Sequence, residues 1–221
     1  MSEQLWGRVD DYIAGKLVHE DAALAAALSA NAAAGLPAID VSAAQGKYLN
    51  LMVRITGAKR VLEFGTLGGY STIWMAKALP ADGRLVTLEY EPKHAEVARK
   101  NIDAAGVGDQ VTIHVGAAID SLPRVAAENP EPFDFIFIDA DKPNNPAYLE
   151  WAVQLSRPGT VIIFDNVVRD GKVLDHENPD PRIIGTRAAY DLIASHPRLS
   201  ATALQTVGSK GWDGFAIMVV D

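Results

Sequence analysis

The sequence VLEFGTLGGYST (residues 61–72) joins a short apolar run to a glycine-rich turn and to the start of a helix-like segment. The run 61–64 predicts a buried strand, and Gly65, Gly68 and Gly69 follow it in the turn. In open α/β sheets, small residues between the first strand and its helix let a ligand approach the backbone. This stretch therefore predicts the first strand–turn–helix unit of an α/β sheet that binds a small ligand.

From Arg60 onward, short apolar runs alternate with amphipathic stretches. This alternation predicts βαβ units and a parallel sheet with helices on both faces. The tail predicts two final strands, 200–207 and 214–220, joined by a turn at GSKGWD. The expected earlier strands are 61–64, 84–89, 111–115, 133–139 and 160–165, and the expected helices among them are 71–79, 92–105, 118–128 and 148–155.

The chain before residue 60 predicts helices and no strand. Apolar residues recur at helical spacing in 5–13, residues 22–34 are rich in alanine, and Ser42 is a candidate N-cap for a helix that continues to Thr56. A long loop, 167–182, is rich in charge, proline and glycine and follows the fifth expected strand. Long loops at such positions are often functional.

The length of 221 residues is sufficient for one well-buried domain. We expect a single domain over 1–221, with a helical cap at 1–57 and an α/β core at 58–221. A formal net charge of -8 disfavours nucleic acid as a partner. The chain has no cysteine, which excludes disulfides and Cys-ligated zinc. The N-terminus does not resemble a secretory signal and the alanine-rich run is too short to cross a bilayer, so we expect a soluble cytoplasmic protein.

Two acidic residues indicate which ligand the glycine turn holds. The turn has neither the G-x-G-x-x-G spacing of dinucleotide-binding folds nor a Walker P-loop. Glu63, just before the glycines, would repel a pyrophosphate but attract an ammonium or a sulfonium. Glu89 ends the second strand, where acidic side chains accept hydrogen bonds from ribose hydroxyls. Either residue alone could be a solvated carboxylate, but together they favour S-adenosylmethionine (SAM) over NAD or ATP.

Three oxygen-bearing side chains follow the fourth and fifth expected strands. Asp139 ends the fourth strand, Asp165 ends the fifth, and Asn166 comes next. Because adjacent parallel strands end at the same edge of a sheet, we expect these side chains to lie together. Carboxylate and amide oxygens are hard ligands that suit magnesium or manganese. The sequence therefore predicts a divalent metal site.

Lys142, three residues after Asp139, is a candidate general base for a substrate at this metal site. The alternative is a surface salt bridge between Lys142 and Asp141. The five histidines show no ligand spacing, so we expect each of them to be structural or solvated.

The segments VLEFGTLGGYS, VTLEYEP, FIDADK and IIFDN occur in this order, and together they resemble the cation-dependent class I O-methyltransferases, the family of catechol and caffeoyl-CoA O-methyltransferases and their bacterial relatives. The upstream segment VSAAQGKYLNLM also resembles a helix of that family, so the similarity runs from about residue 35 to the C-terminus. The resemblance implies a Rossmann-like seven-strand sheet, mostly parallel with an antiparallel last strand, an N-terminal helical extension, SAM as methyl donor and a homodimer.

The resemblance also implies roles for individual residues. Asp139, Asp165 and Asn166 would bind a divalent ion, which is magnesium or alternatively manganese or calcium, and Lys142 would be the general base. The sequence departs from the family at Asn145, where an aromatic residue is common, and at the longer turn GSKGWDG, which could contact a partner subunit. The residues implied to line the methyl donor are Val41, Glu63, Gly65, Thr66, Ser71, Glu89, Ala118, Asp139 and Asp141.

The expected function is divalent-metal-dependent methyl transfer from SAM to a hydroxyl of a catechol-like or caffeoyl-CoA-like vicinal diol. An NAD-dependent oxidoreductase is an alternative on the same fold, but it would leave Asp139, Asp165 and Asn166, the oxygen cluster, unused. A non-catalytic binding protein would likewise have no use for the donor turn, the oxygen cluster and the lysine. A tRNA hydroxyuridine O-methyltransferase would need a local basic patch. The candidates for that patch are Arg54, Lys59 and Arg60, or Arg169 and Lys172.

Overall fold

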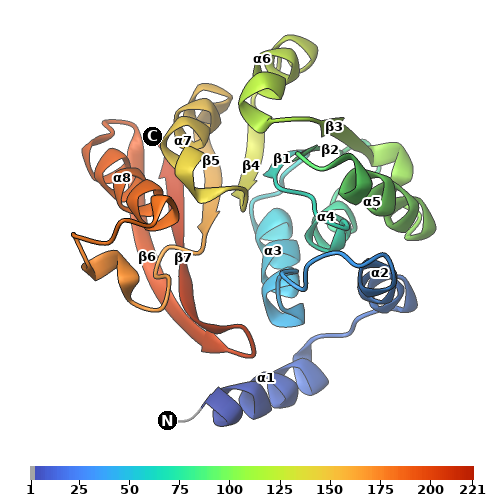
Figure 1. Cartoon of the computed structure of the whole chain (residues 1–221). Coiled ribbons are helices and arrows are strands. Elements are labelled where there is room, and N and C mark those ends of the chain that lie inside the picture. The colour runs from blue at the N-terminus through green and yellow to red at the C-terminus, as the bar shows by residue number, and fades with distance from the viewer. Residues whose placement is uncertain (1–2) are drawn as a thin grey trace.

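A sheet of seven strands forms the centre of the computed structural model, which describes residues 3–221 (Figure 1). The strand order is β3-β2-β1-β4-β5-β7-β6. The strands are β1 (Arg60–Phe64), β2 (Arg84–Glu89), β3 (Val111–Val115), β4 (Phe133–Ile138), β5 (Ser156–Asp165), β6 (Leu199–Gly208) and β7 (Gly211–Val220).

The sheet is parallel from β3 through β5, and β7 pairs antiparallel with both β5 and β6. This topology confirms the prediction of a mostly parallel sheet with an antiparallel last strand. The strand order reverses direction between β1 and β4, and ligands of open α/β sheets bind at such a switch point, beyond the carboxyl ends of the strands. The fold therefore places the candidate site where β1 and β4 end.

The helices cover both faces of the sheet (Figure 1). One face packs on α6, α7 and α8, and the other packs on α3, α4 and α5, with α2 lying over α4 and α5. The helices are α1 (Glu3–Leu17), α2 (Ala22–Ala33), α3 (Ala43–Ile55), α4 (Tyr70–Ala76), α5 (Pro92–Ala104), α6 (Ala118–Glu128), α7 (Asn145–Gln154) and α8 (Pro181–Ser195), with short 3₁₀ turns at Gly108–Gln110, Lys142–Asn144 and Lys172–Leu174.

The N-terminal helices begin where the sequence contains capping residues. The Ser42 hydroxyl accepts a hydrogen bond from the backbone N–H of Gln45, as predicted, and the Asp21 carboxylate caps α2 in the same way. Helices α2 and α3 bury apolar side chains in the core. Helix α1 lies below α3 and beside the C-terminal end of β6 (Figure 1). Tyr12 and Leu17 of α1 are each 69% exposed.

Helix α8 was not predicted from the sequence. Its start carries two recognised signals, because the carboxylate of Asp180 accepts from the Arg182 N–H and Pro181 occupies the first turn. The preceding residues 167–180 are charged and rich in glycine and proline, so the loop prediction extended across this start.

The turn between the last strands is also shorter than predicted. Gly208 pairs with Gly211 and Val207 with Trp212, so only Ser209 and Lys210 form the turn. The segment GSKGWDG therefore consists mainly of paired strand residues. Within residues 3–221, none of the helices has the length and hydrophobicity that a bilayer crossing requires.

Candidate active site

Strand alternation places three carboxylates on one face of the sheet at its carboxyl edge. On β1, β4 and β5, every second residue faces α3 and α4, and Glu63, Asp139 and Asp165 are in phase with these positions. Ile138 pairs with Phe164, so Asp139 and Asp165 are the next residues of two adjacent strands. The register thus brings the carboxylates predicted to bind a metal to neighbouring positions.

The glycine turn passes closely over the end of β4. Gly65 has φ of +94°, and a Cβ at this position would lie 2.2 Å from the backbone oxygen of Asp139. The next two residues are fixed by Glu89, whose Oε2 accepts from the backbone N–H of Thr66 at 3.1 Å and of Leu67 at 2.7 Å. Glu89 therefore holds the turn in shape. Its other oxygen lies 3.2 Å from Nδ1 of His94, a contact that the sequence did not indicate.

Glu63 has no exposed surface and is surrounded by hydroxyl groups. It accepts hydrogen bonds from Ser71 at 2.6 Å, Thr72 at 2.5 Å and Thr87 at 2.8 Å. The pKa of Glu63 is raised to about 7, chiefly by burial and to a smaller extent by the charge of Asp139, against the lowering effect of these hydrogen bonds. A cationic ligand would stabilise the charged form, so Glu63 fits a donor that carries an ammonium or sulfonium.

Asp165 is buried beside the start of α3. Its Oδ2 accepts from the side-chain amide of Gln45 at 2.7 Å, and its Oδ1 accepts from the Asn166 N–H at 2.8 Å. Burial raises the pKa of Asp165 to about 7, and the nearby charge of Asp139 adds to the rise. Gln45 was not identified from the sequence as a site residue, although it lies in the segment that resembles the family.

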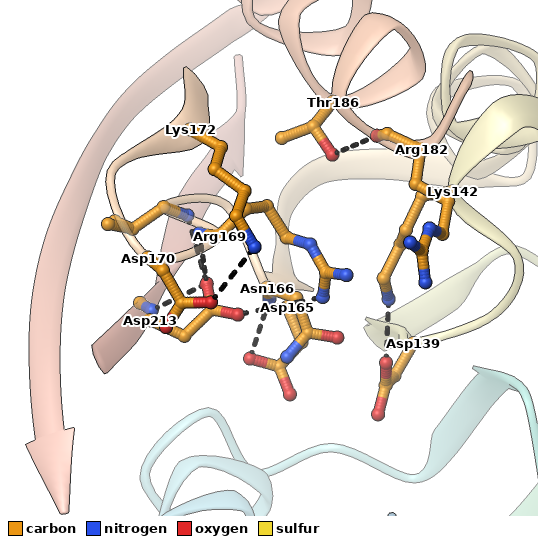
Figure 2. A network of polar contacts seen from close by, with 12 residues as sticks. Asp139, Lys142, Asp165, Asn166, Arg169, Asp170, Lys172, Arg182, Thr186 and Asp213 are labelled. Carbon is orange, nitrogen blue, oxygen red and sulfur yellow. Dashed lines mark hydrogen bonds and ion pairs between the residues drawn. The ribbon is translucent and has the colours of Figure 1, made fainter. Parts of the chain in front are cut away.

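Lys142 is 6% exposed, and its Nζ lies 2.8 Å from Oδ1 of Asp139 (Figure 2). The alternative of a surface salt bridge with Asp141 is therefore wrong. Asp141 instead accepts hydrogen bonds from Asn144 at 2.6 Å and from the Tyr148 hydroxyl. Lys142 is thus a buried lysine bound to one of the candidate metal ligands.

The donor set fits a divalent ion. Asp165 is buried and Asp139 is partly buried, with its side chain 24% exposed. A cation would relieve the repulsion between these two carboxylates, and Asn166 adds an amide oxygen from the same strand end (Figure 2). Within the described part of the chain, no cluster of three His, Cys, Asp or Glu side chains could hold a metal. A site here would therefore consist of two carboxylates, one amide and open positions for water or substrate, which suits magnesium better than zinc.

The remaining candidate donor residues lie around the same edge. Val41 directly precedes the Ser42 cap of α3, Ser71 lies on α4, and Ala118 begins α6 after β3. Asn145, which stands where the family often has an aromatic residue, is completely buried. Its side chain therefore offers no accessible surface on which an acceptor ring could stack.

The loop after Asn166 is held by the segment GSKGWDG, at which the sequence departs from the family. Oδ1 of Asp213 accepts from the backbone N–H groups of Val168 at 2.9 Å and Arg169 at 3.0 Å. The tip of the same hairpin contacts α1, where the Ser209 N–H donates to Asp10 at 2.7 Å. GSKGWDG thus connects the loop that follows the candidate metal ligands to helix α1 of its own chain, and the expected contact with a partner subunit stays a prediction.

Comparisons with known proteins agree with this geometry. The model of a family described as O-methyltransferase matches residues 16–213. A catechol O-methyltransferase of Niastella koreensis is 54% identical, with all of both chains covered. The crystal structure of the O-methyltransferase from Bacillus cereus in complex with SAH is 58% identical over all of both chains, with a TM-score of 0.98. The O-methyltransferase TomG from Streptomyces achromogenes, in complex with SAM, is 47% identical over 100% of this chain and 99% of its own, with a TM-score of 0.96.

Proposed function

Because this chain belongs to the O-methyltransferase family and is a SAM-dependent O-methyltransferase, we propose that it methylates a hydroxyl of a catechol-like vicinal diol with the help of a divalent ion. The observation that carries the proposal is the placement of Asp139, Asp165, Asn166 and Lys142 at one sheet edge beside the glycine turn. The catechol O-methyltransferase at 54% identity supports the diol as acceptor.

The residues of the cluster have distinct tasks in the proposed reaction. A divalent ion bound by Asp139, Asp165 and Asn166 would lower the pKa of a diol hydroxyl. Gln45 fixes the orientation of Asp165 through the bond of 2.7 Å. In its neutral form, Lys142 would accept the hydroxyl proton at Nζ, and Asp139, 2.8 Å away, would stabilise the resulting ammonium.

The glycine turn and its neighbours would hold the methyl donor. We propose Glu63 for its cationic amino acid end and Glu89 for its ribose. The phenolate oxygen, the methyl carbon and the sulfur must lie in line, so rigid support of both substrates should supply much of the rate enhancement. The other residues proposed to line the donor are Val41, Gly65, Thr66, Ser71, Ala118, Asp139 and Asp141.

Membership of the family identifies SAM, not NAD, as the cofactor, and sets aside the oxidoreductase and the non-catalytic protein. For a tRNA acceptor, it is unfavourable that three of the five candidate basic residues pair with acidic side chains. Lys59 lies 2.7 Å from Asp82, Arg60 lies 3.6 Å from Glu131, and Lys172 lies 3.4 Å from Asp170. This pairing, with the net charge of -8, favours a small-molecule acceptor.

We further propose a cytoplasmic homodimer. The family resemblance is the basis for the homodimer, and the cytoplasmic location is carried over from the sequence expectation. Exposed apolar side chains on α1 and α3, such as Tyr12 at 69% and Ile55 at 75% exposure, are consistent with an interface between two copies.

The proposed function is tested by methyl transfer from labelled SAM to catechol, with magnesium and with excess chelator. We expect transfer only with the ion, and we expect Asp165→Ala to abolish it while donor binding persists. Asp170→Asn is the matched control, because Asp170 lies on the same loop and pairs with the exposed Lys172. Undiminished transfer in chelator-treated enzyme would show that the metal role is wrong.

A further inference from the structure

Arg169 lies three residues beyond Asn166 and has no task in the proposed reaction. Its φ of 57° places it in the left-handed region, which is unfavourable for an arginine. Asn166 and Asp170 share this conformation but are residue types that tolerate it. A strained arginine beside a candidate active site points to a function for its side chain.

The surrounding structure enforces this conformation. Asp213 accepts from the backbone N–H of Arg169 at 3.0 Å, and the next N–H, of Asp170, donates to the backbone oxygen of Trp212 at 3.1 Å. The backbone is therefore fixed on both sides of the Arg169 side chain. As a result, the hairpin β6–β7 sets the direction in which the Arg169 side chain leaves the backbone.

The guanidinium is directed into the site. In the view of Figure 2 it points toward Asn166 and Lys142. Its Nη1 lies 3.7 Å from Oδ2 of Asp213, which is longer than a hydrogen bond, and its Nε is enclosed without a hydrogen-bond partner. The side chain is 24% exposed, so the cation is partly dehydrated and only weakly compensated.

The neighbouring cations are already occupied. Arg182 forms a close pair with Asp180 at 2.7 Å, and Lys172 is 58% exposed beside Asp170. Lys142 is bound to Asp139. Arg169 is thus the cation of this group that is best placed to bind a negative charge on a ligand.

We propose that Arg169 is a specificity-determining residue that binds a carboxylate on the acceptor, so that the preferred acceptor is an aromatic vicinal diol that also carries a carboxylate. This proposal rests on the proposed diol methylation. A guanidinium presents a planar set of donors that matches a carboxylate, and the pairing strengthens where water is partly excluded. The divalent ion held by the oxygen cluster would bind the diol end, and Arg169 would bind the carboxylate end of the same molecule.

The test measures binding by calorimetry to enzyme loaded with S-adenosylhomocysteine and magnesium. The two ligands are catechol and 3,4-dihydroxybenzoate, which share the diol and differ in the carboxylate. For the wild type we expect the benzoate to bind at least about tenfold more tightly, the scale of one charge-assisted contact. Arg169→Gln should remove this preference for the benzoate without changing the Kd of catechol. Arg169→Lys should retain part of the preference. Lys172→Gln is the matched control and should leave the preference unchanged.

Three results would overturn the proposal: no binding of the benzoate to the wild type, equal binding of both ligands, or an equal loss for both ligands in Arg169→Gln. The last result would assign Arg169 to support of the loop. Methyl transfer to catechol is measured separately in the same variants. Absence of transfer from an enzyme whose benzoate binding depends on Arg169 would contradict the proposed reaction but support the carboxylate site.

Discussion

Glu63 has no exposed surface, and its ionisation is set by the balance of two opposing effects. Burial favours the neutral acid and raises its pKa to about 7, while hydrogen bonds from Ser71, Thr72 and Thr87 favour the carboxylate. In the unfolded chain the same group has a pKa near 4.5. Between pH 4.5 and about pH 7, the folded protein therefore retains a proton on Glu63 that the unfolded chain has already lost.

This difference predicts a specific pH dependence of stability. Below pH 4.5 the contribution of Glu63 to the free energy of unfolding is fully present, and it is lost as the pH rises to about 7. The total contribution is on the order of 3 kcal/mol. In Glu63→Gln the free energy of unfolding should therefore fall less between pH 5 and pH 8 than in the wild type. Denaturant unfolding of the ligand-free enzyme at both pH values measures the difference.

The control for this prediction is Glu96→Gln, because Glu96 is a surface carboxylate on α5 that pairs with Lys100. It should keep the pH dependence of the wild type. If Glu63→Gln and the wild type lose the same free energy between pH 5 and pH 8, Glu63 titrates normally and burial does not control its charge.

Among the elements, the turn between β1 and α4 depends on the missing side chain of Gly65. Gly65 and Gly159 both have positive φ, +94° and +88°, but only Gly65 is crowded, by the Asp139 backbone oxygen. Alanine at either position carries the backbone cost of about 1 kcal/mol. Gly65→Ala must also push β1 and β4 apart at their carboxyl ends.

We therefore expect Gly159→Ala to lower the melting temperature slightly and to bind S-adenosylhomocysteine like the wild type. Gly65→Ala should lower it further and weaken S-adenosylhomocysteine binding by at least about tenfold, because the turn and Asp139 move together. Calorimetry of both variants separates the effect of φ from that of crowding. Equal affinity in the two variants would mean that the close approach to Asp139 does not shape the donor site.

The elements also show which information the sequence contained. The strands were predictable because β1 and β4 are mostly apolar runs buried on both faces, and the site edge followed because Asp139 and Asp165 end such runs. Contacts between distant segments were not predictable. The hydrogen bond from Gln45 to Asp165 joins residues 120 positions apart. The hydrogen bond from the Arg169 N–H to Asp213 depends on the pairing of β6 with β7. Local signals specify elements, whereas such contacts follow only from the assembled sheet.

In the whole molecule, the three N-terminal helices are attached to the core in different ways. Helices α2 and α3 bury Leu24 and Leu49 in the core, and Asn31 of α2 accepts a hydrogen bond from Asn101 at 3.0 Å beside the glycine turn. Helix α1 contributes mainly the contact between Asp10 and Ser209 and leaves most of its apolar side chains exposed. The proposed cap 1–57 therefore combines two helices that belong to the core with one that does not.

Deletion of residues 1–17 separates these roles. Since α1 buries little apolar surface against its own chain, we expect the shortened enzyme to fold, to lose only a few degrees of melting temperature and to bind S-adenosylhomocysteine with nearly unchanged affinity.

If the exposed face of α1 packs against a second copy, light scattering should show a dimer for the full chain and a monomer for the deletion of residues 1–17. Tyr12→Ser with Leu17→Ser, which keeps α1 and its Asp10 contact, should give the same loss of dimer. A full chain that is monomeric would contradict the homodimer, and a deletion that stays dimeric would place the interface elsewhere on the molecule.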